Sequence, residues 1–333
     1  MTALSVVVPC YNEVDNIARL VATLKAELGP LSGEDYEVLL VDDGSSDGTL
    51  AALRVAAAAD PRFRYVALSR NFGKEAAMLA GLSHSRGDAV ALLDADLQHP
   101  PELLGRMLPL LDQGYQQVVA RRTRDGDSAP RTLMARLYYR LINRLVDVEL
   151  EDGVGDFRVL DRRAVRALLT LGESNRFSKG LFSWIGFETA TVDYRNVARE
   201  AGATKWRMRD LLDYGIDGIL SFNTRPLRLA IWAGVLFTAV AFAYAVWVLV
   251  EAILHGNSVP GYVTIICAVV GMGGVQMVLL GVIGEYLGRI YLETKRRPHF
   301  LVRESSDGPE RTAVTVELGP QHESDGVEPG ERR

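Results

Sequence analysis

Cysteine is almost absent from this chain, which has two among its 333 residues. Cys10 falls at the end of an expected strand and Cys267 inside a long apolar run, so a disulfide framework is not supported. The glycine-rich GxGxxG signature of dinucleotide-binding folds does not follow the first expected strand. No tract of Lys and Arg suggests nucleic acid as a partner, and the net charge of −5 excludes no class of protein by itself.

Long apolar runs, by contrast, are present in the C-terminal part of the chain. Residues 227–254 and 262–284 are each apolar over about the length that crosses a bilayer. Basic residues flank the pair on its two outer sides and are missing from the link 255–261, which favours a cytoplasmic position for the flanks. We therefore expect a two-helix transmembrane hairpin over 227–288 with both termini in the cytoplasm. Two buried helices of a soluble core are the alternative.

The N-terminal part alternates short β-rich runs with helical stretches. Strands are expected at 4–8, 36–41, 63–68, 89–93 and 117–120. Between the first two, apolar residues recur at helical spacing, as at Ile17, Leu20, Leu24 and Leu28. Such alternation predicts an α/β fold with a mostly parallel, Rossmann-like sheet covered by helices on both faces. We assign this cytoplasmic domain to residues 1–205.

Two amphipathic stretches, the basic 131–146 and a second apolar stripe at 211–222, come between the sheet and the apolar runs. Helices of this kind lie at a membrane surface or pack against a partner, and an ordinary packed helix is the alternative for the first. The second predicts a juxtamembrane helix over 206–226. Residues 289–333 are expected to form a cytoplasmic tail that is disordered from about 303, because its end is rich in Glu, Gly, Ser and Pro.

Two acids, Asp94 and Asp96, directly follow the expected strand 89–93. The carboxyl ends of parallel strands are where ligands bind in open α/β sheets. Carboxylate oxygens suit Mg²⁺ or Mn²⁺, and Gln98 could add a neutral oxygen. His99 could also reach such an ion. Acids that merely end a strand, and a plain surface histidine, are the alternatives.

Other strand ends carry groups that suit a nucleotide. Tyr11 can stack on a base, and Asp42 or Asp43 can accept hydrogen bonds from a base or a ribose. Arg70 and Lys74 lie on either side of a flexible glycine and could neutralise a diphosphate, although plain solvation would explain them too.

Taken together, these motifs resemble glycosyltransferase family 2, and within it the membrane-bound polyprenyl-phosphate glycosyltransferases. That group includes bactoprenol glucosyltransferases and dolichol-phosphate mannose synthases. The resemblance covers residues 4 to about 295. In chain order, its motifs are VPCYNE at 8–13, VDDGSSDGT at 41–49, SRNFGK at 69–74, DADLQHPP at 94–101, GDFRVLDRR at 155–163 and NRFSKGL at 175–181.

The resemblance implies a GT-A fold, a divalent metal, and transfer of one sugar from a nucleotide sugar to a polyprenyl monophosphate with inversion. It also implies roles for individual residues. The nucleotide sugar would be held by Pro9, Tyr11, Glu13, Asp42, Asp43, Arg70, Lys74 and Asp94, and the metal by Asp94, Asp96 and Gln98. Asp156 and Asp96 would be catalytic, and the acceptor phosphate would meet Arg121, Arg124, Arg131, Arg158 and Lys205. Two positions, His99 and Trp206, depart from the residues that we expect in the family.

The paired apolar runs fit a lipid acceptor at the cytoplasmic face of the inner (plasma) membrane, and they offer a surface for homo-oligomers. No signal peptide is expected, because a strand begins at Leu4.

UDP-glucose is the favoured donor, with GDP-mannose as the alternative. A processive polysaccharide synthase is disfavoured because its Gln-x-x-Arg-Trp signature is missing. A membrane-anchored sensor that binds a sugar nucleotide without turnover remains open.

Overall fold

The structure is a computed structural model, and it describes residues 3–123, 153–173, 176–194 and 261–308, together with separate residues between 234 and 254. Both expected amphipathic stretches lie outside the described residues, and so do Arg124, Arg131, Lys205 and Trp206.

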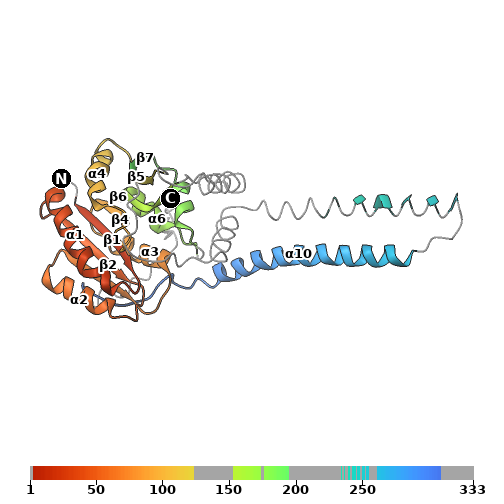
Figure 1. Cartoon of the computed structure of the whole chain (residues 1–333), viewed down its shortest axis with the longest axis horizontal. Helices are drawn as coiled ribbons and strands as arrows, with labels where there is room; N and C mark the ends of the chain where they lie inside the picture. Colours follow the sequence, from red (N-terminus) through yellow and green to blue (C-terminus); the bar gives the residue numbers. More distant parts are fainter. Residues whose placement is uncertain are drawn as a thin grey trace, which may run out of the picture.

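A single eight-stranded sheet forms the centre of the described domain (Figure 1). Its strand order is β7-β5-β6-β4-β1-β2-β3-β8. Neighbouring strands run parallel in the pairs β1/β2, β1/β4, β2/β3 and β5/β7, and antiparallel in β3/β8, β4/β6 and β5/β6. The strands are β1 (Leu4–Cys10), β2 (Tyr36–Asp42), β3 (Phe63–Leu68), β4 (Ala89–Leu92), β5 (Gln117–Arg122), β6 (Val154–Asp161), β7 (Thr189–Tyr194) and β8 (Val302–Ser305).

Helices cover both faces of this sheet, as the alternating pattern predicted. The apolar residues of α1, α2 and α4 pack on one face, and those of α3, α6 and α7 pack on the other. The residues predicted from helical spacing, Ile17, Leu20, Leu24 and Leu28, are all buried in the first of these layers. The α/β prediction is therefore confirmed. The helices are α1 (Val14–Ser32), α2 (Thr49–Ala59), α3 (Lys74–His84), α4 (Leu104–Asp112), α6 (Arg162–Thr170), α7 (Ser178–Trp184) and α10 (Tyr262–Thr294), with a 3₁₀ turn η1 (Pro101–Leu103).

Three strands were not among those predicted from the sequence. β6 enters the sheet antiparallel between β4 and β5, and β7 pairs with β5 at one edge. The third, β8, comes after α10 and forms the other edge by pairing antiparallel with β3. The sheet of the α/β domain thus takes its last strand from the far end of the described chain.

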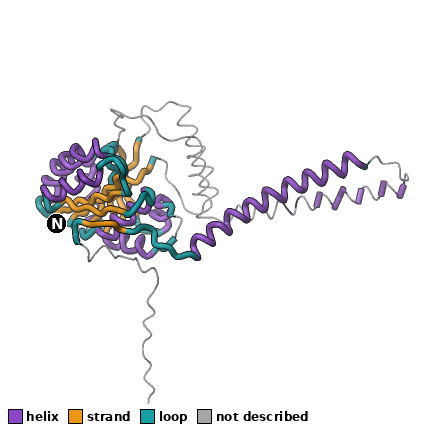
Figure 2. The backbone as a smooth tube through the Cα atoms, turned by 90° about the horizontal axis from the view of Figure 1, so that it is seen from below, coloured by secondary structure: helices purple, strands orange, loops and turns teal. Residues whose placement is uncertain are grey.

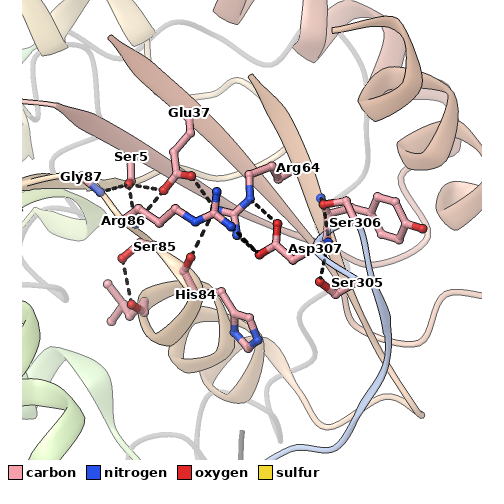
Figure 3. Close-up of polar contacts among 12 residues, drawn as sticks. Ser5, Glu37, Arg64, His84, Ser85, Arg86, Gly87, Ser305, Ser306 and Asp307 are labelled. Atoms are coloured by element: carbon pink, nitrogen blue, oxygen red, sulfur yellow. Dashed lines mark hydrogen bonds and ion pairs between the residues drawn. The ribbon is translucent and has the colours of Figure 1, made fainter. Parts of the chain in front are cut away.

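The attachment of β8 differs from the expectation of a tail disordered from about 303. Phe300 is buried under one face of the sheet, and Ser306 donates its backbone N–H to the carbonyl of Tyr65 at 3.0 Å. Just beyond, the carboxylate of Asp307 contacts Arg64, whose guanidinium also contacts Glu37 (Figure 3). Residues 302–308 belong to the folded domain because a buried charged network and a strand ladder hold them.

α10 projects away from the α/β domain as one long helix (Figures 1 and 2). Among the described residues, one helical stretch is long and apolar enough to cross a membrane, Gly271–Thr294, and none of it is buried within the protein. The expected span 262–284 lies within α10, which continues ten residues further. The other expected span, 227–254, is described only at separate positions, which are helical and include the exposed side chains of Leu236, Phe242 and Ile253.

Candidate active site

The groups predicted to bind a nucleotide sugar gather at the carboxyl edge of β1, β2 and β4. These three strands are parallel, so the segments that follow them leave the sheet on the same side. β6 runs the other way and therefore begins at this edge. Because Leu92 lies opposite Arg158 in the β4/β6 ladder, continuing the register by two residues brings Asp94 opposite Asp156.

Lys74 joins these two facing carboxylates. Its Nζ lies 2.6 Å from Oδ1 of Asp94 and 2.6 Å from Oδ2 of Asp156. Burial alone would lower the pKa of Lys74, but the two carboxylates outweigh it and raise that pKa above its ordinary value. Burial alone would raise the pKa of Asp156, yet the charges of Lys74 and Lys179 hold it below its usual range. Lys74 and Asp156 are therefore ionised near neutral pH, and the ammonium lies between the carboxyl groups of Asp94 and Asp156.

Asp96 lies at the exposed rim of this site. Leu97 has φ of 54°, a left-handed conformation that costs a non-glycine residue about 1 kcal/mol or more and reverses the chain between Asp96 and Gln98. Oδ1 of Asp96 accepts the backbone N–H of Gln98 at 3.1 Å. The two acids and the Gln98 amide have the oxygen chemistry that suits Mg²⁺ or Mn²⁺. Among the described side chains, no three acidic, His or Cys groups are gathered closely enough to form a complete metal centre by themselves.

His99 is packed into the wall of the site rather than lying free on the surface. Its ring lies 5.5 Å from that of Phe157 and 5.7 Å from that of Tyr194, measured between centroids. Nδ1 is 2.6 Å from the hydroxyl of Tyr194, and Nε2 is 3.8 Å from Oδ2 of Asp94. Burial lowers the pKa of His99 against the opposing effect of Asp94. Tyr194 was not predicted, because nothing in the sequence marked β7 as a neighbour of β5.

The segments after β2 and β3 are tied together by Asp43. This buried carboxylate accepts the backbone N–H groups of Phe72 at 2.7 Å and of Gly73 at 2.9 Å. Burial raises the pKa of Asp43 although both hydrogen bonds act to lower it. Gly44 completes the contact, since a Cβ there would lie 2.3 Å from the carbonyl carbon of Arg70. Asp43 thus shapes the loop that leads into Lys74, in addition to its predicted role at the nucleoside.

The segment after β1 is held against the one after β2 in a similar way. Asn12, with φ of 53°, accepts the backbone N–H of Ser46 at 2.9 Å, and Glu13 donates its own N–H to Oγ1 of Thr49 at 2.9 Å. Tyr11 is left 47% exposed, which suits its predicted stacking role. Two further residues predicted to bind the nucleotide lie at this corner. Pro9 is partly buried near the end of β1, and Asp42 is buried at the end of β2, where it accepts the N–H of Ser45 at 3.3 Å.

The basic residues predicted around the site have different surroundings. Arg70 is exposed and lies over the ring of Phe72 at 4.6 Å. Arg121 forms hydrogen bonds of 2.7 and 3.1 Å with the carboxylate of Asp193 near the surface. Arg158 is only 3% exposed, stacks 3.5 Å over Phe182, and has a pKa lowered to about 10 by burial. A phosphate from solvent cannot reach this position, so we leave Arg158 out of the acceptor site.

Comparison with known proteins places this geometry in a family. The family model described as "Glycosyl transferase family 2" matches residues 5–169, and a second, "GtrB C-terminal hairpin", matches residues 225–290. The protein CsbB of Bacillus subtilis (strain 168) is 50% identical over 303 residues, which cover 91% of this chain and 92% of CsbB. The "Bactoprenol glucosyl transferase" of Shigella phage SfX is 38% identical over 301 residues, covering 90% of this chain and 98% of the phage protein.

A third relative, the "Prophage bactoprenol glucosyl transferase homolog" of Escherichia coli (strain K12), is 37% identical over 90% of this chain and 98% of its own length. Solved structures match more distantly. A mannosyltransferase from Pyrobaculum calidifontis in complex with GDP-Man and Mn²⁺ has a TM-score of 0.44 and 17% identity, over 87% of this chain and 85% of its own. The fold, the site and the close relatives together define a glycosyltransferase. The chain belongs to glycosyltransferase family 2.

Proposed function

We propose that this enzyme transfers one glucose from UDP-glucose to a polyprenyl monophosphate at the cytoplasmic face of the membrane, with inversion at the anomeric carbon. The observation that carries the proposal is the juxtaposition of a family 2 site with a membrane-length helix, α10, whose following strand is part of the same sheet. The names of the phage and Escherichia coli relatives support glucose and a bactoprenol-type acceptor.

The nucleotide would lie along the carboxyl edge of the sheet. Tyr11 is exposed for stacking on the base, and Asp42 and Asp43 end β2 beside it. Lys74 contacts both Asp94 and Asp156, and α3 begins at this residue, so the positive end of the helix faces the site. A diphosphate that approached this edge would meet both the ammonium and the helix terminus.

A divalent cation would be held by Asp94, Asp96 and Gln98. When bound, such an ion neutralises the charge that develops on a departing nucleoside diphosphate. Asp96 is an exposed residue, and one of its carboxylate oxygens accepts the backbone N–H of Gln98.

The acceptor requires little activation by the protein. A phosphate monoester oxygen is already ionised near neutral pH, so positioning and charge neutralisation supply the catalysis instead of a strong base. Asp156 would then orient the reacting groups. Its ion pair with Lys74 offsets the repulsion that a lone carboxylate would exert on an anionic phosphate. Arg121, Arg124, Arg131 and Lys205 remain the proposed contacts of the acceptor phosphate.

The membrane location follows from the acceptor. Withdrawing a polyprenyl chain from the bilayer costs about 0.8 kcal/mol per CH₂ group, so the enzyme must act at the membrane. We propose two spans, with the catalytic domain and both termini in the cytoplasm and the juxtamembrane helix 206–226 at the headgroups. The hairpin match over residues 225–290 supports this arrangement.

The test is transfer by membranes that contain the protein. They are incubated with polyprenyl phosphate and radiolabelled UDP-glucose or GDP-mannose, with and without a chelator. We expect a chelator-sensitive glucolipid from UDP-glucose, and its loss in Asp96→Asn. A mannolipid would correct the donor, and no glycolipid from either donor would refute the transferase proposal. Chelator-resistant transfer, or full activity in Asp96→Asn, would refute the metal role.

A further inference from the structure

His99 is held in one orientation by its neighbours. Its side chain is 18% exposed, its ring lies against Phe157 and Tyr194, and a Cβ added at Gly155 would be in ordinary van der Waals contact with the ring at 3.7 Å. The 2.6 Å contact between Nδ1 and the Tyr194 hydroxyl fixes the direction in which the opposite nitrogen points. Nε2 therefore faces the acids at the carboxyl end of β4.

Asp94 presents its second oxygen to this nitrogen. Oδ1 of Asp94 is taken by Lys74 at 2.6 Å, whereas Oδ2 lies 3.8 Å from Nε2 of His99. That separation is too long for a hydrogen bond. It is shorter than two metal–ligand bonds of about 2.1 Å placed end to end, so one cation can contact both atoms.

We propose that Nε2 of His99 is a ligand of the divalent metal, together with Asp94, and that Tyr194 is the outer partner that orients the imidazole. A metal-bound histidine usually gives its other ring N–H to an oxygen, which the Tyr194 hydroxyl can accept. The inference rests on the proposed metal dependence and adds a nitrogen ligand to its oxygen set. A nitrogen ligand favours Mn²⁺ over Mg²⁺, because Mg²⁺ prefers an all-oxygen shell.

The competing explanation is that His99 only packs between two aromatic rings. Packing alone would give His99 variants lower stability but the same metal coordination. The two explanations therefore differ in a spectroscopic property that does not require catalysis.

The experiment is pulsed electron paramagnetic resonance of Mn²⁺ bound to the purified full-length protein in detergent, in the presence of UDP, with GDP in a parallel sample. We expect the nitrogen coupling of a directly bound imidazole in the unaltered protein, and a change of that coupling on ¹⁵N-histidine labelling. His99→Ala should abolish the coupling and weaken Mn²⁺ binding at least tenfold. Tyr194→Phe should retain the coupling with weaker binding, and the control His299→Ala should match the unaltered protein.

No Mn²⁺ binding, no imidazole coupling in the unaltered protein, or unchanged coupling in His99→Ala would overturn the proposal. The unaltered protein alone decides the matter if His99→Ala fails to fold. Imidazole coupling without any glycolipid product would support His99 as a metal ligand and refute the proposed function. Metal-dependent transfer without imidazole coupling would refute His99 as a ligand and leave the proposed function standing.

Discussion

Arg64 and Asp307, 243 residues apart along the chain, form a buried ion pair at the amino edge of the sheet, with Nε donating to Oδ1 at 2.9 Å. Their side chains are 8% and 9% exposed, and Glu37 contacts the same guanidinium (Figure 3). The edge opposite the active site thus fastens the segment that follows α10 to the start of β3.

Replacing Asp307 with Asn should destabilise the domain by about 3 kcal/mol, because it removes one partner of a buried charge network and leaves Arg64 and Arg86 with less compensation. Chemical denaturation of the purified protein in detergent measures this loss. Glu304→Gln is the control, since it breaks the more exposed ion pair between Glu304 of β8 and Arg54 of α2. An equal loss of unfolding free energy in the two variants would contradict a larger contribution from the buried Asp307 network.

A methyl group at Gly44 should disrupt the packing of the loop after β2 against the loop after β3. In Gly44→Ala the new Cβ would meet the backbone of Arg70 and Asn71, at a residue with φ of 69°, so we expect a loss of about 2 to 4 kcal/mol and a strong loss of transfer. Denaturation and initial transfer rates measure the two effects. Gly114→Ala separates strain from contact, because φ is 105° there but nothing lies within 4 Å of the added carbon. Equal losses of stability and of transfer in the two variants would show that the contact of Gly44 with the Arg70 backbone is not the cause.

Removing the charge of Lys74 should impair donor use more than stability. Lys74→Met leaves Asp94 and Asp156 facing each other without the ammonium between them, and we expect kcat/KM for the sugar nucleotide to fall about a hundredfold. Steady-state transfer assays across donor concentrations measure it. Arg70→Met should cost less, since Arg70 stacks on Phe72 away from the two acids. A larger loss in Arg70→Met would assign the main diphosphate contact to Arg70 instead.

Acid should unfold the domain partly through Asp60. Its hydrogen bonds with Arg62 hold the pKa of Asp60 below its usual range, against the effect of burial and with help from Lys25. A carboxyl whose pKa is lower in the folded state stabilises above its unfolded pKa of about 3.9, and that stabilisation is lost as the pH falls below it. Asp60→Asn should therefore be less stable at pH 7 and lose less stability between pH 5 and 3. If the unaltered protein and Asp60→Asn lost the same stability between pH 5 and 3, the assignment to Asp60 would be contradicted.

Much of this arrangement follows from the sequence because the first five strands are apolar runs separated by amphipathic helices. Their parallel order alone brings Tyr11, Asp42 and Asp94 to one edge. The prediction stops at β6, whose stretch Val154–Asp161 contains a glycine, two aspartates and the buried Arg158, so it has no strand-like alternation. Without β6 there is no register to bring Asp156 opposite Asp94.

The same reason explains the misplacement of Arg158. An arginine in a polar motif suggests an exposed cation that could bind phosphate, whereas its stacking on Phe182 depends on a helix distant in sequence. β8 was missed because Val302–Ser305 is short and charged, and its place in the sheet depends on β3 and on the partners of Asp307.

The position of β8 also sets an order of assembly during synthesis. β3 keeps an open edge until Val302–Ser305 has left the ribosome, which occurs only after the whole of α10 has been made. An open strand edge can pair with other chains, so a product that ends within α10 would expose the unpaired edge of β3 and be prone to aggregation. Only a chain that has completed α10 can close the sheet of its own catalytic domain.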